Sequence, residues 1–161
     1  MRKVAFPPVI NKDSRILLLG TMPSEESLRI QQYYGHKSNQ FWKILFTLFN
    51  KPFSLDYKER VALLIDNGIA LWDVLCSCEG TGSADSDIKA EEANDFIHLF
   101  KAYPQINHIF FTSKKAEEFY KKHIGFSDNK CYTTLPSPSS ANARMNLARK
   151  TEEWKIILEY L

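Results

Sequence analysis

The chain alternates between short, continuous apolar runs and longer segments in which apolar residues recur at helical spacing. Residues 15–20 form a nearly unbroken apolar run that ends in Gly20, a pattern typical of a parallel strand buried on both faces. Residues 69–75, 106–112 and 130–135 are expected to form three further strands. We therefore expect four strands in all.

Helical spacing marks the segments between and after these runs. The residues that mark the expected helices are Phe41, Leu45, Leu48 and Phe49; Val61, Leu64 and Ile65; Phe96, Leu99, Phe100 and Tyr103; Ala116, Phe119, Tyr120 and His123; and Trp154, Ile157, Leu158 and Leu161. The second helix begins with a capping box at residues 56–59 and stops at Gly68, and the last lies within residues 141–161. Alternating strands and helices predict one three-layer α/β/α domain over residues 1–161, with a mainly parallel central sheet of about four strands.

The loops that follow the expected strands carry the unusual residues of the chain. These loops are residues 21–24, 76–87, 113–115 and 136–140. In a parallel sheet all four emerge at the carboxyl edge, where open α/β sheets bind their ligands. The sequence thus predicts a functional site at that edge.

Composition narrows the class of protein. The 161 residues carry 21 Lys and Arg against 19 Asp and Glu, and this net charge of +2 permits nucleic-acid binding without arguing for it. No apolar run is long enough for a membrane span or a secretory signal, so a cytoplasmic protein is expected. Three cysteines without a CxxC pair argue against a disulfide framework and a zinc site.

Familiar hydrolytic and nucleotide-binding motifs do not occur in the sequence, which lacks GxSxG, Walker, HExxH and GxGxxG patterns. Of the four histidines, only His36 lies in an unusual segment. Asp73 and Asp85 are the candidate carboxylates. For Asp73, a structural role at the end of a strand, bonded to neighbouring backbone amides, is favoured over catalysis.

Two widely separated segments carry a specific resemblance to the uracil-DNA glycosylase superfamily. Tyr34, His36, Asn39, Phe41 and Trp42 follow the spacing of its first motif, and Leu135-Pro136-Ser137-Pro138-Ser139 resembles its second. A weaker match joins residues 71–74 to residues 82–86. The motifs occur in the order of the family, over nearly the whole chain, and the chain is most similar to the hypoxanthine-DNA glycosylase branch.

This resemblance implies that Asn39 is the catalytic residue. A glycosylase extrudes the target base and holds it in a pocket while the sugar develops oxocarbenium character and charge moves onto the base. An amide can position water and can donate to the departing base, and neither role requires a titrating group. From the residues alone, a role for Asn39 as the cap of the helix that follows it would be favoured over catalysis, and the two roles could coexist.

The resemblance also implies a base pocket, formed by Gly20, Thr21, Met22, Pro23, Tyr34 and Ser137. Tyr34 would stack on the flipped base, and the turn after Gly20 would present backbone N–H groups to it. Met22 stands where uracil-cleaving relatives carry a water-activating Asn or Asp, which favours hypoxanthine over uracil. The alternatives are that Tyr34 is an aromatic residue at the edge of the core, and that the segments after Gly20 and around Ser137 are ordinary turns.

The residues implied to contact DNA are His36, Lys114, Pro138, Ser139 and Ser140. The loop of Pro138, Ser139 and Ser140 would fill the gap that the extruded base leaves, and its prolines would stiffen it. His36 and Lys114 could bind phosphates. The alternatives are that residues 138–140 form a plain turn, that His36 has a structural role and that Lys114 is a solvated surface charge.

Taken together, the resemblance implies a monomeric DNA glycosylase without cofactor or metal, acting in base-excision repair away from membranes. Its substrate would be DNA containing a deaminated base, with deoxyinosine favoured. The alternatives are a uracil- or mismatch-directed glycosylase, a non-catalytic module that binds damaged DNA, and a nucleotide-binding α/β protein. The last is weakened because the chain lacks a glycine loop to cradle phosphates.

Overall fold

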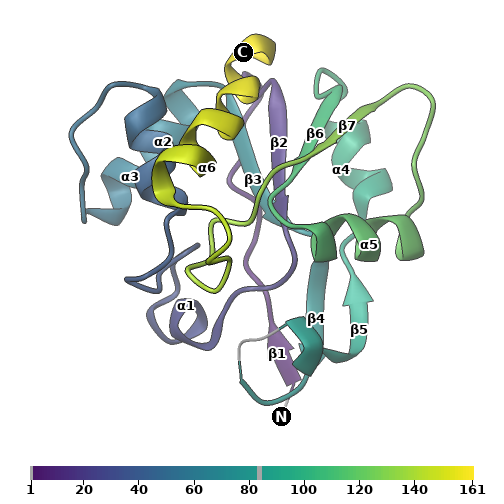
Figure 1. The fold of residues 1–161 in the computed structure, drawn as a ribbon. Coiled ribbons are helices and arrows are strands. Elements are labelled where there is room, and N and C mark those ends of the chain that lie inside the picture. The colour runs from purple at the N-terminus through teal and green to yellow at the C-terminus, as the bar shows by residue number, and fades with distance from the viewer. Residues whose placement is uncertain (1, 83–84) are drawn as a thin grey trace.

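A computed structural model describes residues 2–82 and 85–161. Its central sheet contains β2 (Ile16–Gly20), β3 (Ile69–Asp73), β6 (His108–Phe111) and β7 (Cys131–Thr134). The strands lie in the order β3-β2-β6-β7, and every neighbouring pair is parallel (Figure 1). The expected four-stranded parallel sheet is confirmed.

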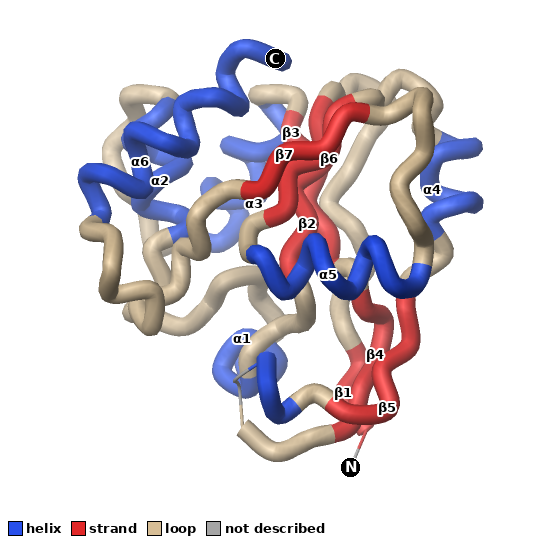
Figure 2. The backbone as a smooth tube through the Cα atoms, turned by 45° about the vertical axis from the view of Figure 1, so that its right-hand side comes forward, coloured by secondary structure: helices blue, strands red, loops and turns tan. Residues whose placement is uncertain are grey.

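Helices cover both faces of this sheet (Figures 1 and 2). One face carries α2 (Phe41–Leu48), α3 (Tyr57–Asp66) and α6 (Leu147–Trp154), and the other carries α4 (Phe96–Ala102) and α5 (Lys114–His123). Successive side chains of a strand point to opposite faces. Leu18 therefore packs with the first group of helices and Leu19 with the second, which explains why the strand is apolar throughout. The three-layer prediction is confirmed.

A second, antiparallel sheet extends beyond the carboxyl end of β3. It has the order β1-β4-β5, with β1 (Arg2–Val4), β4 (Leu75–Glu79) and β5 (Lys89–Ala93). The prediction of one strand over residues 69–75 was therefore wrong, because the chain changes sheet at Val74, whose N–H donates to the Gly20 carbonyl at 2.8 Å. The prediction of a loop over residues 76–87 was also wrong in its first part.

The polar composition of this loop segment misled the sequence-based assignment. Residues 76–79 belong to β4, and a short 3₁₀ turn at Asp85–Asp87 follows. The hydrogen bonds that hold β4 come from β1 and β5, which are distant in sequence or on the far side of a turn. Within the weaker motif match, Ser83 and Ala84 lie outside the described residues.

The helix boundaries differ from expectation in three places. Helix α1 (Glu25–Ile30) was not predicted, and the last helix starts only at Leu147 and continues after Trp154 as the 3₁₀ segment Lys155–Tyr160. In α3, Asp56 caps the N–H of Lys58 as expected. Glu59 does not bond the N–H of Asp56 directly; it accepts from the Ser54 hydroxyl, which in turn accepts the N–H of Asp56. Gly68 adopts the positive φ of 74° that ends such a helix.

Candidate functional site

A cleft of about 700 Å³ opens at the carboxyl edge of the central sheet. It is lined by Gly20, Thr21, Met22, Pro23, Ser24, Ser27, Tyr33, Tyr34, His36, Ser38, Asn39, Asp73, Thr112, Ser113, Ser137, Pro138, Ser139, Ser140, Ala141 and Asn142. The structure thus brings together every residue that the sequence proposed for catalysis, base binding and DNA contact, except Lys114. The residues come from the ends of β2 and β3, from the loops after β2, β6 and β7, from α1 and from the segment between α1 and α2.

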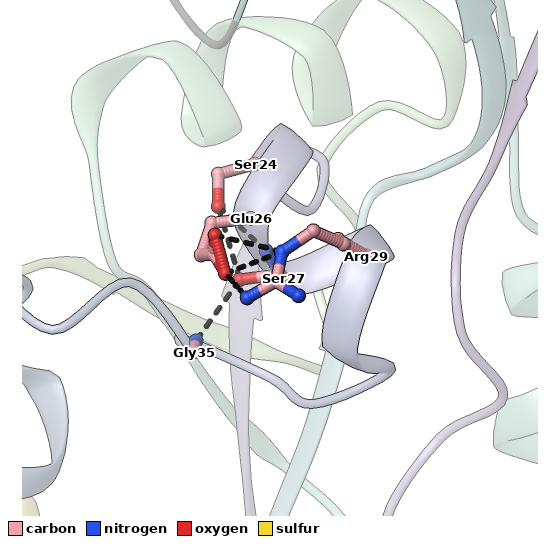
Figure 3. Close-up of polar contacts among 5 residues, drawn as sticks. All are labelled: Ser24, Glu26, Ser27, Arg29 and Gly35. Atoms are coloured by element: carbon pink, nitrogen blue, oxygen red, sulfur yellow. Dashed lines mark hydrogen bonds and ion pairs between the residues drawn. The ribbon is translucent and has the colours of Figure 1, made fainter.

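Helix α1 is hydrogen-bonded to the backbone at Gly35, the residue that follows Tyr34 in the sequence (Figure 3). Ser24 caps α1 by accepting the N–H of Ser27 at 3.1 Å, and the buried Ser27 hydroxyl accepts the N–H of Gly35 at 2.9 Å. Glu26 and Arg29 form an ion pair on the outer side of the same helix. The unpredicted helix therefore fixes the backbone between Tyr34 and His36.

Tyr34 is held as a rigid aromatic wall of the cleft. Its ring stacks on Phe41, with 3.9 Å between the ring centroids and 6° between the planes. Its hydroxyl lies 2.9 Å from the Thr112 hydroxyl, and its backbone has a positive φ of 51°. One face of the ring is occupied by Phe41, so a base can stack only on the other face.

Asn39 has one engaged end and one available end. Its Oδ1 accepts the N–H of Phe41 at 2.9 Å, while Gln40, at the formal cap position of α2, caps nothing with its side chain. Because that N–H needs an oxygen, the amide NH₂ group must point the other way. Within the described residues the NH₂ group donates no hydrogen bond, although Asn39 lines the cleft. Capping and chemistry are thus compatible in one side chain.

The floor of the cleft is built on Gly20. A methyl group placed on its Cα would lie 2.6 Å from Asp73 Oδ1 and 2.7 Å from the Tyr34 hydroxyl. Asp73 is only 3% exposed, yet it contributes to the lining of the cleft. Its main-chain carbonyl accepts from the side chain of Asn94 at 2.8 Å. The Asp73 carboxyl group and the Tyr34 hydroxyl therefore both lie against the main chain at Gly20, where a side chain would not fit.

Gly20→Ala should slow base release at least tenfold, because the methyl group would displace Asp73 or Tyr34 from this point. Overpacking of this kind costs about 1–3 kcal/mol, so the melting temperature should also fall by several degrees. Single-turnover cleavage and thermal melting measure the two effects. An unchanged cleavage rate would show that the space above Gly20 is not used by the substrate.

Residues 137–142 form a loop that is folded by its own side chains. The Ser137 hydroxyl accepts the N–H of Ser139 at 3.2 Å, and the Ser139 hydroxyl accepts the N–H of Ala141 at 3.2 Å. The Asn142 amide donates back to the Ser137 carbonyl at 3.2 Å. The shape of the loop is therefore stabilised by hydrogen bonds within the loop itself.

This loop is joined directly to the segment that contains Asn39. The N–H of Gln40 donates to the Pro138 carbonyl at 2.9 Å, and the hydroxyls of Ser38 and Ser140 lie 3.1 Å apart. The two segments of the sequence resemblance are thus hydrogen-bonded neighbours at the rim of one cleft.

The two residues proposed to contact phosphates differ in placement. His36 Nδ1 accepts the N–H of Ser38 at 3.1 Å, so the neutral ring carries its proton on Nε2, which can donate outwards. Lys114 is exposed at the start of α5, beside Ser113, whose hydroxyl caps that helix. Ser113 lines the cleft, whereas Lys114 does not, and a contact of Lys114 with DNA stays a prediction.

Several cleft residues were given no individual role from the sequence, although Ser24 and Ser113 lie in loops that were expected at this edge. They are Ser24, Ser27, Tyr33, Ser38, Ala141 and Asn142, together with Thr112 and Ser113 after β6. Six of these eight are small polar residues, and closeness in sequence to a proposed residue could have pointed only to Ser24, Tyr33, Ser38, Ser113 and Ala141. No group of three or more His, Cys, Asp or Glu residues that could hold a metal ion is found in the described ranges. None of the helices in the described part of the chain is long and apolar enough to cross a membrane.

Comparisons with known proteins agree with this geometry. A family model described as "Uracil DNA glycosylase superfamily" matches residues 7–161. The chain is 37% identical over 163 residues to a Methanosarcina acetivorans protein named hypoxanthine DNA glycosylase, covering 99% of this chain and 100% of the relative. A Methanosarcina barkeri protein of the same name is 36% identical over 154 residues, covering 94% of this chain and 95% of the relative.

A solved structure has the same fold. It is a solution NMR structure of a Methanosarcina acetivorans protein, provisionally named a uracil DNA glycosylase. It superposes with a TM-score of 0.81 at 36% identity, and the match covers 98% of this chain and 96% of that one.

Proposed function

Because the chain belongs to the uracil-DNA glycosylase superfamily, we propose that it hydrolyses the N-glycosidic bond of a deaminated base in DNA, with hypoxanthine preferred. The observation that carries this proposal is the hydrogen-bonded junction between the Asn39 segment and the loop of residues 137–142 across the mouth of one cleft. An extruded base would enter there, between the Asn39 amide and the loop of residues 137–142. The loop would fill the space that the base leaves in the duplex.

The Asn39 amide is the group best placed for the chemical step. Its oxygen is held by the Phe41 N–H, so its NH₂ group is oriented without the substrate. A preorganised donor is effective because it stabilises charge on the departing base without reorganising during the reaction. The same group can hold the attacking water. Met22, which lines the same cleft, offers neither function, and this supports the hypoxanthine preference.

The floor of the cleft offers the donor and acceptor pattern that hypoxanthine requires. Hypoxanthine presents an N1–H donor next to its O6 acceptor, whereas adenine presents an acceptor at N1 and a donor at N6. When ionised, the Asp73 carboxylate can only accept, and it lies at the floor beside Gly20. The N–H groups of Thr21 and Met22 donate no hydrogen bond within the described residues and can serve O6. We infer that these groups read hypoxanthine and disfavour adenine.

Incubation of excess protein with duplexes that contain deoxyinosine, deoxyuridine or deoxyxanthosine, followed by heating in alkali, tests this function. We expect strand breaks at deoxyinosine in the presence of EDTA, because the proposed mechanism uses no metal. Cleavage at deoxyuridine alone would support the uracil-directed alternative and refute the hypoxanthine preference. The absence of cleavage on all three, with binding retained, would favour a damage-binding module.

A further inference from the structure

Lys150 of α6 is a buried cation directly behind the cleft. The residue is 1% exposed, and burial lowers the pKa of its ammonium group. The ammonium donates to Gln40 Oε1 at 2.8 Å and to the Ser139 carbonyl at 3.0 Å. Within the described residues, no carboxylate lies at ion-pair distance from it. A charge is thus held in the interior by neutral oxygens only.

Such an arrangement is not explained by stability alone. Removing an ammonium group from water is costly, and well-packed apolar side chains often stabilise a protein at least as well as buried charges. Apolar packing already joins this part of α6 to α2, since Trp154 meets Phe41 with 5.7 Å between the ring centroids. An apolar residue at position 150 would continue that contact, so the retained charge indicates another role.

The two acceptors of Lys150 identify that role. Gln40 directly follows Asn39, and its N–H donates to the Pro138 carbonyl. Ser139 lies at the centre of the loop of residues 137–142, which faces the same cleft. One ammonium group therefore bridges the segment that carries the proposed catalytic amide and the loop that would enter the duplex.

We propose that Lys150 is a positioning residue for base excision, which sets the spacing between Asn39 and the loop of residues 137–142. This inference rests on the proposed glycosylase function. Two hydroxyls and one main-chain bond also join these segments, but among the described residues only Lys150 contacts both of them through a fully buried side chain. The catalytic amide of Asn39 and the loop of residues 137–142, which would fill the gap left by the extruded base, would then move as one unit.

Lys150→Met tests the proposal, because methionine keeps most of the side-chain volume and removes the ammonium group. We expect the single-turnover rate on duplex deoxyinosine to fall at least tenfold at saturating enzyme, while the melting temperature stays equal or rises. Hydrogen exchange should accelerate at the N–H groups of Gln40 and Asn142, which bond Pro138 and Ser139. Exchange in α5 should not change.

Lys130→Met is the matched control. Burial also lowers the pKa of Lys130, and its ammonium donates to the Ile106 carbonyl at 2.5 Å, but neither residue lines the cleft. This variant should keep the wild-type cleavage rate and the wild-type exchange at Gln40. Gln40→Met provides a second route if Lys150→Met folds poorly. It should lower the rate, and adding it to Lys150→Met should lower the rate little further.

The outcomes separate this inference from the proposed function. If wild-type protein cleaves no substrate, the proposed function fails, and exchange at Gln40 and Asn142 alone decides whether Lys150 positions the two segments. A Lys150→Met rate within twofold of wild type would overturn the inference. So would faster exchange throughout the chain with a lowered melting temperature, because Lys150 would then serve stability.

Discussion

Asn39→Asp is expected to slow single-turnover release of hypoxanthine about a hundredfold, which corresponds to about 2.7 kcal/mol in the barrier. Aspartate keeps the oxygen that accepts the Phe41 N–H at 2.9 Å, so the start of α2 should remain capped. The opposite end changes from a donor into a carboxylate oxygen, which cannot donate to the departing base. The melting temperature should therefore stay within about 2 °C of wild type.

Asn146→Asp is the matched control for this change. Asn146 caps α6 by accepting the N–H of Arg149 at 2.9 Å, and it does not line the cleft. Its substitution should leave both cleavage and melting unchanged. If Asn39→Asp lowered the melting temperature and left the cleavage rate intact, Asn39 would be a helix cap without a chemical role.

Tyr34→Ala is expected to reduce cleavage of single-stranded and double-stranded deoxyinosine DNA alike, by roughly five- to 150-fold. Stacking of a base on an aromatic ring contributes about 1–3 kcal/mol in proteins that bind single strands. The ring also stacks on Phe41 at 3.9 Å, so some loss of stability should accompany the change, about 0.5–1.5 kcal/mol. Single-turnover rates on matched single- and double-stranded oligonucleotides measure the effect.

Tyr34→Phe separates stacking from hydrogen bonding. Phenylalanine keeps the ring and its contact with Phe41 but loses the hydroxyl that lies 2.9 Å from Thr112. We expect it to retain most of the activity. Equal losses in Tyr34→Phe and Tyr34→Ala would mean that the hydroxyl, and not the ring, is the functional part of Tyr34.

The central layers of the fold were predictable because their signal is local. The runs around Leu18, Ile69 and Ile109 are continuous and apolar, since those strands are covered on both faces. The second sheet was not predictable by the same logic. The sequence Cys76-Ser77-Cys78 is small and polar, and it becomes a strand only because β1 and β5 supply its hydrogen bonds. Helix α1 is too short to show a clear periodicity.

The site was predictable to a different extent. Its two main segments were found from motif spacing, and the parallel order of the strands explains why they converge on one cleft. The burial of Lys150 could not be predicted from the sequence, because a lysine in an amphipathic helix normally faces solvent. Its buried ammonium bonds Gln40 and Ser139, which both lie outside its own helix, so its burial is a tertiary property. The placement of Asp73 beside Gly20 likewise arises only when β2 and β3 pair.

The internal hydrogen bonds of residues 137–142 have a consequence for how damage is found. A segment that is already ordered loses little conformational entropy when it meets DNA. Under the proposed function such a loop would also adapt little to the duplex, so the work of separating the strands would fall on the nucleic acid. Base extrusion costs least where a pair is mismatched or weakened. The first discrimination between damaged and normal sites would then be made by the stability of the base pair itself, before any atom of the base is read.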